Sequence, residues 1–223
     1  MAGVPANPKI YHFTHVRNLP GIVEAGVLWS DAKRIELGLD CAIVGMSQIK
    51  QRRLKEIEVR CHAGTKVGDY VPFYFCPRSI MLYILHMGNH PDLNYTEGQA
   101  PIVHLQADLR ATIRWADERG IRWAFSDRNA GGYLAQFFDS VEDLDKVSWP
   151  AVRATDFRDM VVREGKQAEF LLWEYFPCEL IEKIGVIDAK RSAAVDRALA
   201  NATHLPRVSV ECGWYYLGEG LEP

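Results

Sequence analysis

Hydrophobic and polar residues alternate along several short segments of the chain, which is the pattern of β-strands with one buried face. The clearest segment is residues 69–75, where Val71, Phe73 and Phe75 recur at every second position. Pro72 within it indicates an edge strand or a bulge, because proline has no N–H to donate to a neighbouring strand. Similar patterns predict strands over residues 10–13, 101–106, 122–126, 167–175, 184–187 and 207–210.

Helical spacing and helix-terminal residues predict helices between these strands. Asn18 as N-cap, Pro20 in the first turn and Gly26 beyond the last turn bound a helix over residues 19–25. The same reasoning predicts helices over residues 79–87, 108–118, 129–138, 140–144 and 189–201. Residues 49–54 suit a helix or a mobile loop, and loops are predicted over residues 30–38 and 149–163.

Strands and helices follow one another irregularly, without βαβ periodicity or a glycine-rich phosphate loop. This order predicts an α+β fold with a mostly antiparallel sheet flanked by helices. The 223 residues, 48% hydrophobic and 25% charged, have the composition of a globular protein. No repeat, low-complexity tract or linker divides them, so residues 1–223 are expected to form a single domain.

The charge of the chain favours nucleic-acid binding only where basic residues cluster. The formal net charge of -3 does not favour non-specific nucleic-acid binding, so any such contact needs a local basic patch. Two basic clusters could provide one: Lys50, Arg52, Arg53, Lys55 and Arg60; and Arg153, Arg158, Arg163 and Lys166. The predicted loop that carries the second cluster also contains Trp149 and Phe157, which suits phosphate contacts combined with base stacking. The alternative is a solvated charged loop.

Cysteine and histidine spacing indicates neither a disulfide framework nor a metal site. The five cysteines include no CxxC pair, and the seven histidines include no HxxxH pair. Residues 1–8 lack the apolar core of a signal peptide, and no segment approaches a membrane-spanning apolar run. We therefore expect a cytoplasmic protein with no metal and no membrane association.

Glu169 is a carboxylate inside an otherwise apolar predicted strand. Alternation places Glu169, Leu171 and Trp173 on one face of that strand. A charge there is costly unless it faces solvent or a cleft. Two interpretations remain: an edge-strand glutamate paired with an arginine, or a carboxylate that faces a functional cleft.

Motifs spread over the chain favour the second interpretation. A strand ending in His12-x-Thr14, an aromatic strand and then Glu169 resemble, in that order, the H-Y-E arrangement of NAD-dependent ADP-ribosyltransferases. The fuller strings are similar to those of the DarT family of DNA ADP-ribosyltransferase toxins, and the resemblance extends from Ile10 to Tyr216. These strings are YHFTHVRNLPGIVEAG, DYVPFYFCPRSIMLYIL, GQAPIVHL, FSDRNA and KQAEFLLW.

The resemblance implies an ADP-ribosyltransferase-like fold with a split sheet, and roles for individual residues. Glu169 matches the family's catalytic glutamate, and Arg53 matches a catalytic arginine, although Arg52 is adjacent. The residues implied in binding NAD are His12 and Thr14, Gly21 through close backbone approach, and Phe73 and Tyr74 beside the nicotinamide.

The resemblance also implies a substrate and a partner. The expected reaction is transfer of ADP-ribose from NAD to a nucleobase, most readily thymine, in single-stranded DNA. The DNA-binding residues would come from the basic clusters: Lys50, Arg52, Arg153, Arg158, Arg163 and Lys166. A toxin of this family is expected to meet an antitoxin with an ADP-ribose-removing domain. Guanine, RNA or protein as acceptor, or a silent module that binds NAD or nucleic acid, are the alternatives.

Overall fold

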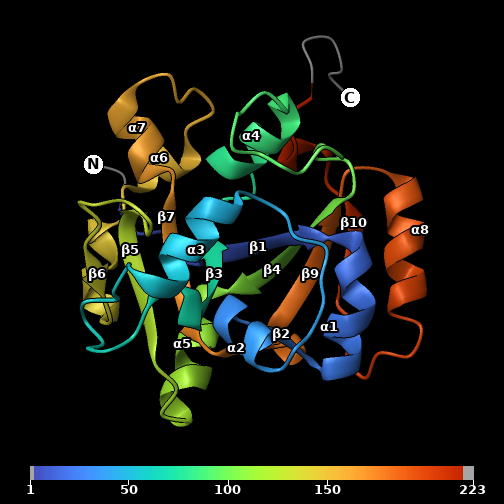
Figure 1. The fold of residues 1–223 in the computed structure, drawn as a ribbon, viewed down its shortest axis with the longest axis horizontal. Coiled ribbons are helices and arrows are strands. Elements are labelled where there is room, and N and C mark those ends of the chain that lie inside the picture. The colour runs from blue at the N-terminus through green and yellow to red at the C-terminus, as the bar shows by residue number, and fades with distance from the viewer. Residues whose placement is uncertain (1–2, 218–223) are drawn as a thin grey trace.

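The computed structural model describes residues 3–217, and an eight-stranded sheet is its central feature (Figure 1). Its strands are β1 (Lys9–His15), β3 (Tyr70–Tyr74), β4 (Ile102–Asp108), β5 (Trp123–Asn129), β6 (Phe137–Phe138), β7 (Ala168–Trp173), β9 (Ile181–Val186) and β10 (Arg207–Val210). They lie in the order β10-β9-β4-β1-β3-β7-β5-β6, and only β9 and β10 pair in parallel. The predicted α+β class with a mostly antiparallel sheet is confirmed. A small second sheet joins β2 (Val27–Trp29) to β8 (Tyr175–Pro177).

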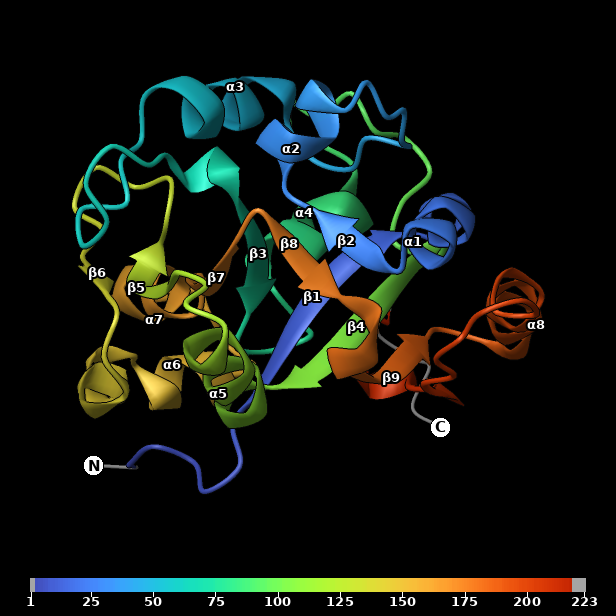
Figure 2. The same ribbon diagram turned by 90° about the horizontal axis from the view of Figure 1, so that it is seen from below.

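Helices cover both faces of the large sheet. They are α1 (Leu19–Ala25), α2 (Asp31–Glu36), α3 (Ser47–Lys55), α4 (Ile80–Met87), α5 (Leu109–Glu118), α6 (Trp149–Arg153), α7 (Met160–Gly165) and α8 (Ala189–Ala198). Figure 2 shows α2 and α3 on one side of the sheet and α5 and α6 on the other. No helix within residues 3–217 is both long enough and apolar enough to cross a membrane.

The sheet is split between β1 and β3, as the resemblance implied. These strands are in register only at Tyr11 and Tyr74, whereas β3 pairs with β7 along its whole length. Pro72 therefore lies in an interior strand, and the prediction of an edge or bulge was wrong. The missing N–H is tolerated because β3 has no continuous ladder on its β1 side at this point.

The main core lies between the sheet and α5, α6 and α8. Phe73, Phe125 and Phe170 are buried there, and each is at most 1% exposed. The residues after β10 close one end of the molecule, where Tyr215 and Tyr216 are buried and Trp214 packs on Gly185. The C-terminal aromatic residues therefore pack onto the sheet.

Three predicted segments were wrong. Residues 30–38, predicted as a loop, contain α2, whose first turn is capped by the Ser30 side chain. Residues 149–163, also predicted as a loop, contain α6 and the start of α7. Residues 129–138, predicted as a helix, form turns and β6. The helix predicted over residues 140–144 is present as a 3₁₀ helix, Val141–Lys146. The ambiguous residues 49–54 are helical, as part of α3.

Candidate active site

A cavity of about 960 Å³ lies against the sheet beneath α1, α2 and α3. Its volume is at the upper end of the range for small-molecule and cofactor sites. The cavity brings together residues that are far apart in the sequence. Among them are His12, Thr14, Gly21, Lys50, Arg53, Tyr74 and Glu169, all of which were predicted from the sequence to belong to the site.

Glu169 lies at the wall of this cavity and is only 2% exposed. Arg53 donates to its carboxylate twice, from Nη1 to Oε1 at 3.1 Å and from Nη2 to Oε2 at 2.7 Å. The backbone N–H of Ala130 donates to Oε1 at 3.1 Å. Because β7 lies between β3 and β5, this glutamate is not on a sheet edge. It pairs with an arginine, as the first interpretation held, and it faces a cavity, as the second held.

The two neighbouring arginines of α3, Arg52 and Arg53, differ in exposure. Arg53 points toward the sheet with 14% of its side chain exposed, whereas Arg52 is exposed and its Nε lies 3.6 Å from Glu56. Burial acts to lower the pKa of Arg53, but the charge and hydrogen bonds of Glu169 outweigh it, so the pKa is raised above its ordinary value. Arg53 is thus the arginine whose cation meets the buried carboxylate.

His12 is held as a neutral imidazole. Its Nδ1 donates to the backbone carbonyl of Pro72 at 2.8 Å, at the point where β1 and β3 separate. Removal from water lowers the pKa of His12 to about 4, so the ring is uncharged near neutral pH. Because Nδ1 carries the proton, Nε2 is left as a hydrogen-bond acceptor suited to a hydroxyl group.

Asn18 connects this wall to the segment that covers the cavity. Its Nδ2 donates to Thr14 Oγ1 and to the Ala42 carbonyl, each at 3.0 Å, and its Oδ1 accepts from the Ala42 N–H at 2.7 Å. The side chain was predicted to cap α1, but it makes no capping hydrogen bond. No pattern in the sequence indicated that Asn18 holds the loop after α2 over the cavity.

The aromatic strand contributes one ring to the cavity. Tyr74 lines the cavity, and its ring stacks on Phe13 with centroids 5.9 Å apart. Phe73 is on the opposite face of β3 and only 1% exposed, so the structure does not bring it into the cavity. Its ring packs on His12 and Phe176, with centroids 5.6 and 4.5 Å away, and supports His12 from behind.

Gly21 lines the cavity from α1. A Cβ added there would meet no other atom of the protein within 4 Å. The space beside this backbone is therefore open to a ligand.

Asp31 is a cavity residue that the sequence did not single out, because it lies in the stretch predicted as a loop. Its Oδ1 accepts from Lys50 Nζ at 3.0 Å, so α2 and α3 are joined by an ion pair. Ser30 followed by Asp31 was the available signal, since serine favours the N-cap and an acidic residue favours the first turn of a helix.

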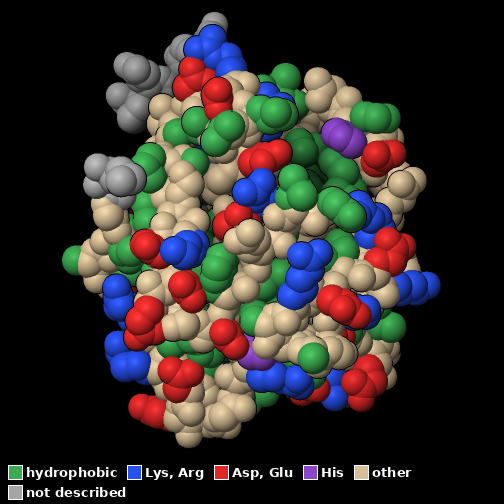
Figure 3. Space-filling view, turned by 90° about the vertical axis from the view of Figure 1, so that its left-hand side faces the viewer, with side chains coloured by type: hydrophobic (Ala, Val, Ile, Leu, Met, Phe, Trp, Pro, Cys, Tyr) green, Lys and Arg blue, Asp and Glu red, His purple; other side chains and the backbone are tan. Residues whose placement is uncertain are grey.

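The predicted DNA-binding residues after β6 differ in exposure. Arg153, Arg158 and Arg163 are all exposed. Arg158 is paired with Asp156, and Arg163 donates to the Phe157 carbonyl at 3.3 Å. Lys166 is only 3% exposed, and its Nζ donates to the Val152 carbonyl at 3.0 Å. Figure 3 shows basic and acidic side chains interspersed over the face it presents, so any contact with a polyanion there is local.

Known proteins resemble the chain over nearly its whole length. The family model "DarT: ssDNA thymidine ADP-ribosyltransferase, DarT" matches residues 11–216. A DNA ADP-ribosyl transferase of Thermus aquaticus is 38% identical over 95% of this chain and 90% of its own length.

Solved structures are also similar to this chain over nearly its whole length. Thermus sp. 2.9 DarT in complex with ADP-ribosylated ssDNA has a TM-score of 0.86 and 34% identity, covering 96% of this chain and 99% of that chain. The same protein in complex with NAD+ has a TM-score of 0.76 and 33% identity, covering 95% of this chain and 99% of that chain.

Proposed function

The chain belongs to the DarT family, and we propose that it transfers ADP-ribose from NAD to thymine in single-stranded DNA. It is an NAD-dependent DNA ADP-ribosyltransferase by family. The choice of thymine rests on the family description. The choice of single-stranded DNA rests on the same description and on the complex of the Thermus sp. 2.9 protein with ADP-ribosylated ssDNA. The observation that carries the proposal is the Arg53–Glu169 pair in the cavity that His12 and Thr14 also line.

The cavity suits the dinucleotide co-substrate. NAD supplies the ADP-ribosyl group and releases neutral nicotinamide, so departure of that group needs no general acid. The acceptor nitrogen of neutral His12 and the Thr14 hydroxyl suit hydroxyl groups of a ribose. The Tyr74 ring offers a wall on which an aromatic leaving group can stack, and Gly21 leaves room for close approach.

Glu169 is proposed as the catalytic carboxylate. Cleavage of the nicotinamide–ribose bond develops positive charge on the sugar, as in glycoside hydrolysis. A carboxylate that accepts from the ribose 2-hydroxyl gains strength as that charge grows, which stabilises the transition state more than the bound substrate. Burial at 2% exposure keeps water from weakening the interaction.

The acceptor nitrogen of thymine carries a proton that must leave as the new bond forms. In the proposed step, the ring nitrogen attacks the anomeric carbon, the electron pair of the old glycosidic bond stays with nicotinamide, and Glu169 takes the proton. Arg53 then stabilises the negative charge that develops on the exocyclic oxygen of the base. The pair in the substrate-free protein must loosen for both groups to act.

The DNA strand is proposed to follow the basic side chains around the cavity. Arg52, Arg153, Arg158 and Arg163 are proposed to contact phosphates, and Lys50 lies at the cavity itself. The buried Lys166 is proposed to act indirectly, because its ammonium is already bonded to the Val152 carbonyl. Acting on a single strand avoids the cost of extracting a base from a duplex.

Replacement of Glu169 tests the chemical step. With labelled NAD and single-stranded DNA, Glu169→Gln is expected to lower single-turnover transfer by about 10²–10³-fold, the typical loss when a group that stabilises transition-state charge is removed. Glu118→Gln, at the exposed end of α5, is the matched control and is expected to transfer normally. Parallel reactions with duplex DNA, RNA and protein identify the acceptor. Near-wild-type transfer by Glu169→Gln would contradict the assignment of Glu169 as the catalytic carboxylate.

The adjacent arginines provide a second comparison. Arg53→Ala is expected to lose transfer by at least about tenfold across the pH range, because it removes the cation beside the carboxylate and leaves that carboxylate buried and unpaired. Arg52→Ala is expected to alter DNA affinity and its salt dependence but to leave the rate at saturating DNA near that of the wild type. Equal losses in the two variants would contradict the assignment.

Toxicity and neutralisation form a separate part of the proposal, resting on family membership. The enzyme is proposed to act in the cytoplasm and to be countered by an antitoxin with an ADP-ribose-removing domain. Expression of the wild type, but not of Glu169→Gln, is expected to arrest growth, and co-expression of an ADP-ribose-removing hydrolase is expected to restore it. Growth arrest by both forms would count against enzymatic toxicity.

A further inference from the structure

A second cavity, of about 430 Å³, lies next to the catalytic one. Its walls are the turn between β3 and α4, the segment between α6 and α7, Lys166 and Tyr216. Tyr74 and Met81 line the catalytic cavity, whereas the residues between them, from Phe75 to Arg78, line the second. The segment from Tyr74 to Met81 therefore contributes residues to both cavities.

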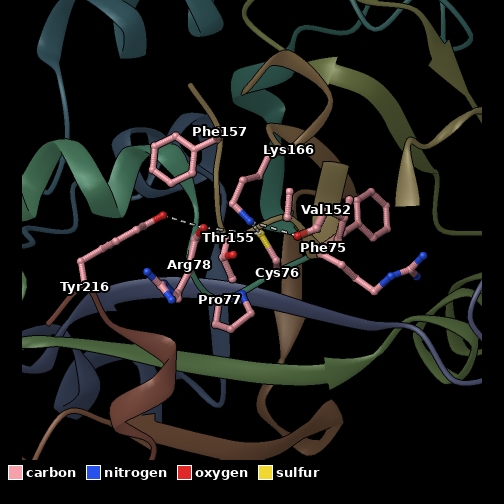
Figure 4. Close-up of a pocket in the computed structure, with 11 residues that line it drawn as sticks. Phe75, Cys76, Pro77, Arg78, Val152, Thr155, Phe157, Lys166 and Tyr216 are labelled. Atoms are coloured by element: carbon pink, nitrogen blue, oxygen red, sulfur yellow. Dashed lines mark hydrogen bonds between the residues drawn. The ribbon is translucent and has the colours of Figure 1, made fainter. Parts of the chain in front are cut away.

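The side chains of this second cavity are aromatic and basic. Figure 4 shows Phe157 and Lys166 on one side and Pro77 and Arg78 facing them. The Arg78 guanidinium lies over the Tyr216 ring, 4.6 Å from its centroid, and Arg153 at the rim is exposed. No Asp or Glu is among the described residues that line the cavity. Aromatic rings and arginine planes stack on nucleobases, and unopposed arginines attract phosphate.

Hydrogen bonds hold the walls of this cavity in place before any ligand binds. Lys166 Nζ lies 3.0 Å from the Val152 carbonyl and 3.5 Å from Cys76 Sγ, which joins α6 to the β3–α4 turn. Tyr216 donates from its hydroxyl to the Arg78 carbonyl at 2.9 Å, and its backbone N–H donates to Gln99 at 3.0 Å. Such preorganisation lowers the entropic cost of ordering a ligand.

Phe157 is the ring best suited to contact a ligand. It is partly exposed, and it is itself supported edge-on by Tyr83 and Tyr216, with centroids 5.2 and 6.0 Å away. Trp149, the other aromatic residue of this segment, is 3% exposed and donates to the Leu144 carbonyl, so it belongs to the core. Thr155 is exposed at the rim and offers a hydroxyl to a base edge.

We propose that the second cavity binds a nucleotide adjoining the modified base of the single-stranded substrate, with its base against Phe157 and Arg78 and its phosphate at Arg153. This inference rests on the proposed function, and it adds a specificity site to it. A base held there fixes the strand in register, so that the target base is presented to Glu169 in the neighbouring cavity. Discrimination among neighbouring bases then arises from stacking and from polar contacts such as Thr155.

Abasic oligonucleotides test this subsite. The substrates are single-stranded pentanucleotides with one central thymine, either intact or with an abasic residue on its 5′ or its 3′ side. For the wild type, one of the two abasic substitutions is expected to lower kcat/KM about tenfold, the usual effect of losing one base–aromatic stack. Phe157→Ala is expected to lower kcat/KM for the intact strand by a similar factor and to abolish the difference between intact and abasic strands.

Further variants separate stacking from damage to the fold. Phe157→Trp is expected to restore the difference between the strands, because its ring can again stack on the base. Met160→Ala, on α7 and 69% exposed, is the control for the segment. Arg153→Ala is expected to raise KM for DNA. It is also expected to reduce the slope of log KM against the logarithm of the salt concentration by about 1, the change expected for the loss of one phosphate contact.

The outcomes distinguish the two proposals. Equal kcat/KM for intact and both abasic strands, or a Phe157→Ala variant that retains the difference, would overturn the subsite while leaving the proposed function standing. Failure of the wild type to label any of these strands with ADP-ribose would overturn both.

Discussion

Glu169 and Arg53 stabilise each other where either charge alone would be costly. The carboxylate is 2% exposed and the guanidinium side chain 14% exposed, so neither is fully hydrated. Removing one partner of a buried pair typically costs about 3–5 kcal/mol, because the other charge is left uncompensated. Changes in activity at either position therefore need a parallel measurement of stability, which isosteric Glu169→Gln makes easier to interpret than alanine.

Two buried histidines make stability depend on pH. Removal from water lowers the pKa of both His12 and His104 to about 4, from an unfolded value near 6.5. Above pH 6.5 both states are neutral and the contribution to stability is complete. Between pH 6.5 and about 4 only the unfolded state takes up protons, so the free energy of unfolding is expected to fall by up to about 1.4 kcal/mol per pH unit for each histidine.

Thermal unfolding from pH 8 to pH 4 measures this effect. The wild type is expected to keep a constant Tm down to about pH 6.5, as far as these histidines are concerned, and to lose stability below it. His12→Gln, which removes one titrating ring, is expected to have a shallower decline. The same slope in both proteins would contradict a depressed pKa at His12.

At the level of single residues, the sequence was sufficient for some side chains and not for others. Alternation alone placed the side chains of Glu169 and Phe170 on opposite faces of the strand, and the structure confirms that arrangement. The choice between Arg52 and Arg53 needed the rotation of α3, which nine residues of weak amphipathic pattern do not define. Phe73 and Tyr74 were both expected beside the ligand. Neighbours on a strand point to opposite faces, so only one of them can line the cavity, and the motif does not say which face is buried.

Short elements account for most of the errors in the secondary structure. Helix α2 has six residues and α6 has five, too few to produce a hydrophobic period, and tertiary contacts stabilise such helices more than propensity does. Helix α6 starts at Trp149, whose indole N–H bonds to the Leu144 carbonyl. By contrast, α5 and α8 have ten residues each with Asp caps and were predicted closely.

The position of α3 depends on a glycine outside it. A Cβ at Gly68 would lie 2.8 Å from both Cα and Cδ2 of Leu54, the residue after Arg53. Gly68→Ala is therefore expected to displace α3, to cost about 1–3 kcal/mol of stability, and to lower kcat/KM by tenfold or more by moving Arg53 away from Glu169.

Kinetics and thermal unfolding together check this expectation. Gly213→Ala is the control, since its Cβ would meet nothing within 4 Å and its φ is not in the left-handed region. Unchanged kcat/KM in Gly68→Ala would show that α3 does not need this close contact.

At the scale of the whole molecule, the proposed active site is assembled from segments that no local pattern links. The catalytic cavity draws on β1, the α1–α3 region and β3, and then on Glu169, almost a hundred residues after Tyr74. Strands could be predicted, but the split between β1 and β3 that exposes Pro72 to His12 depends on the order of strands in the sheet. Family resemblance implied a split sheet where residue patterns could not, but the strand order comes from the structure.

The closure of the C-terminal segment on the sheet is expected to govern global stability. Trp214 packs so closely that a Cβ at Gly185 would lie 2.3 Å from its ring, and the same ring contacts Tyr11 and His104. Gly185→Ala is expected to cost about 1–3 kcal/mol, a Tm decrease of roughly 2–10 °C. Because neither residue lines the catalytic cavity, transfer well below Tm is expected to remain within a few-fold of the wild type, and an unchanged Tm would contradict the close packing.

The two ends of the large sheet have a consequence for behaviour at high concentration. One end is β6, with two residues, and the other is β10, with four, of which Arg207 is exposed. Strands this short offer few unpaired N–H and C=O groups to a second molecule, and an exposed cation opposes stacking of like chains. We therefore expect the folded protein to resist edge-to-edge aggregation, so that any precipitation on heating would follow unfolding rather than precede it.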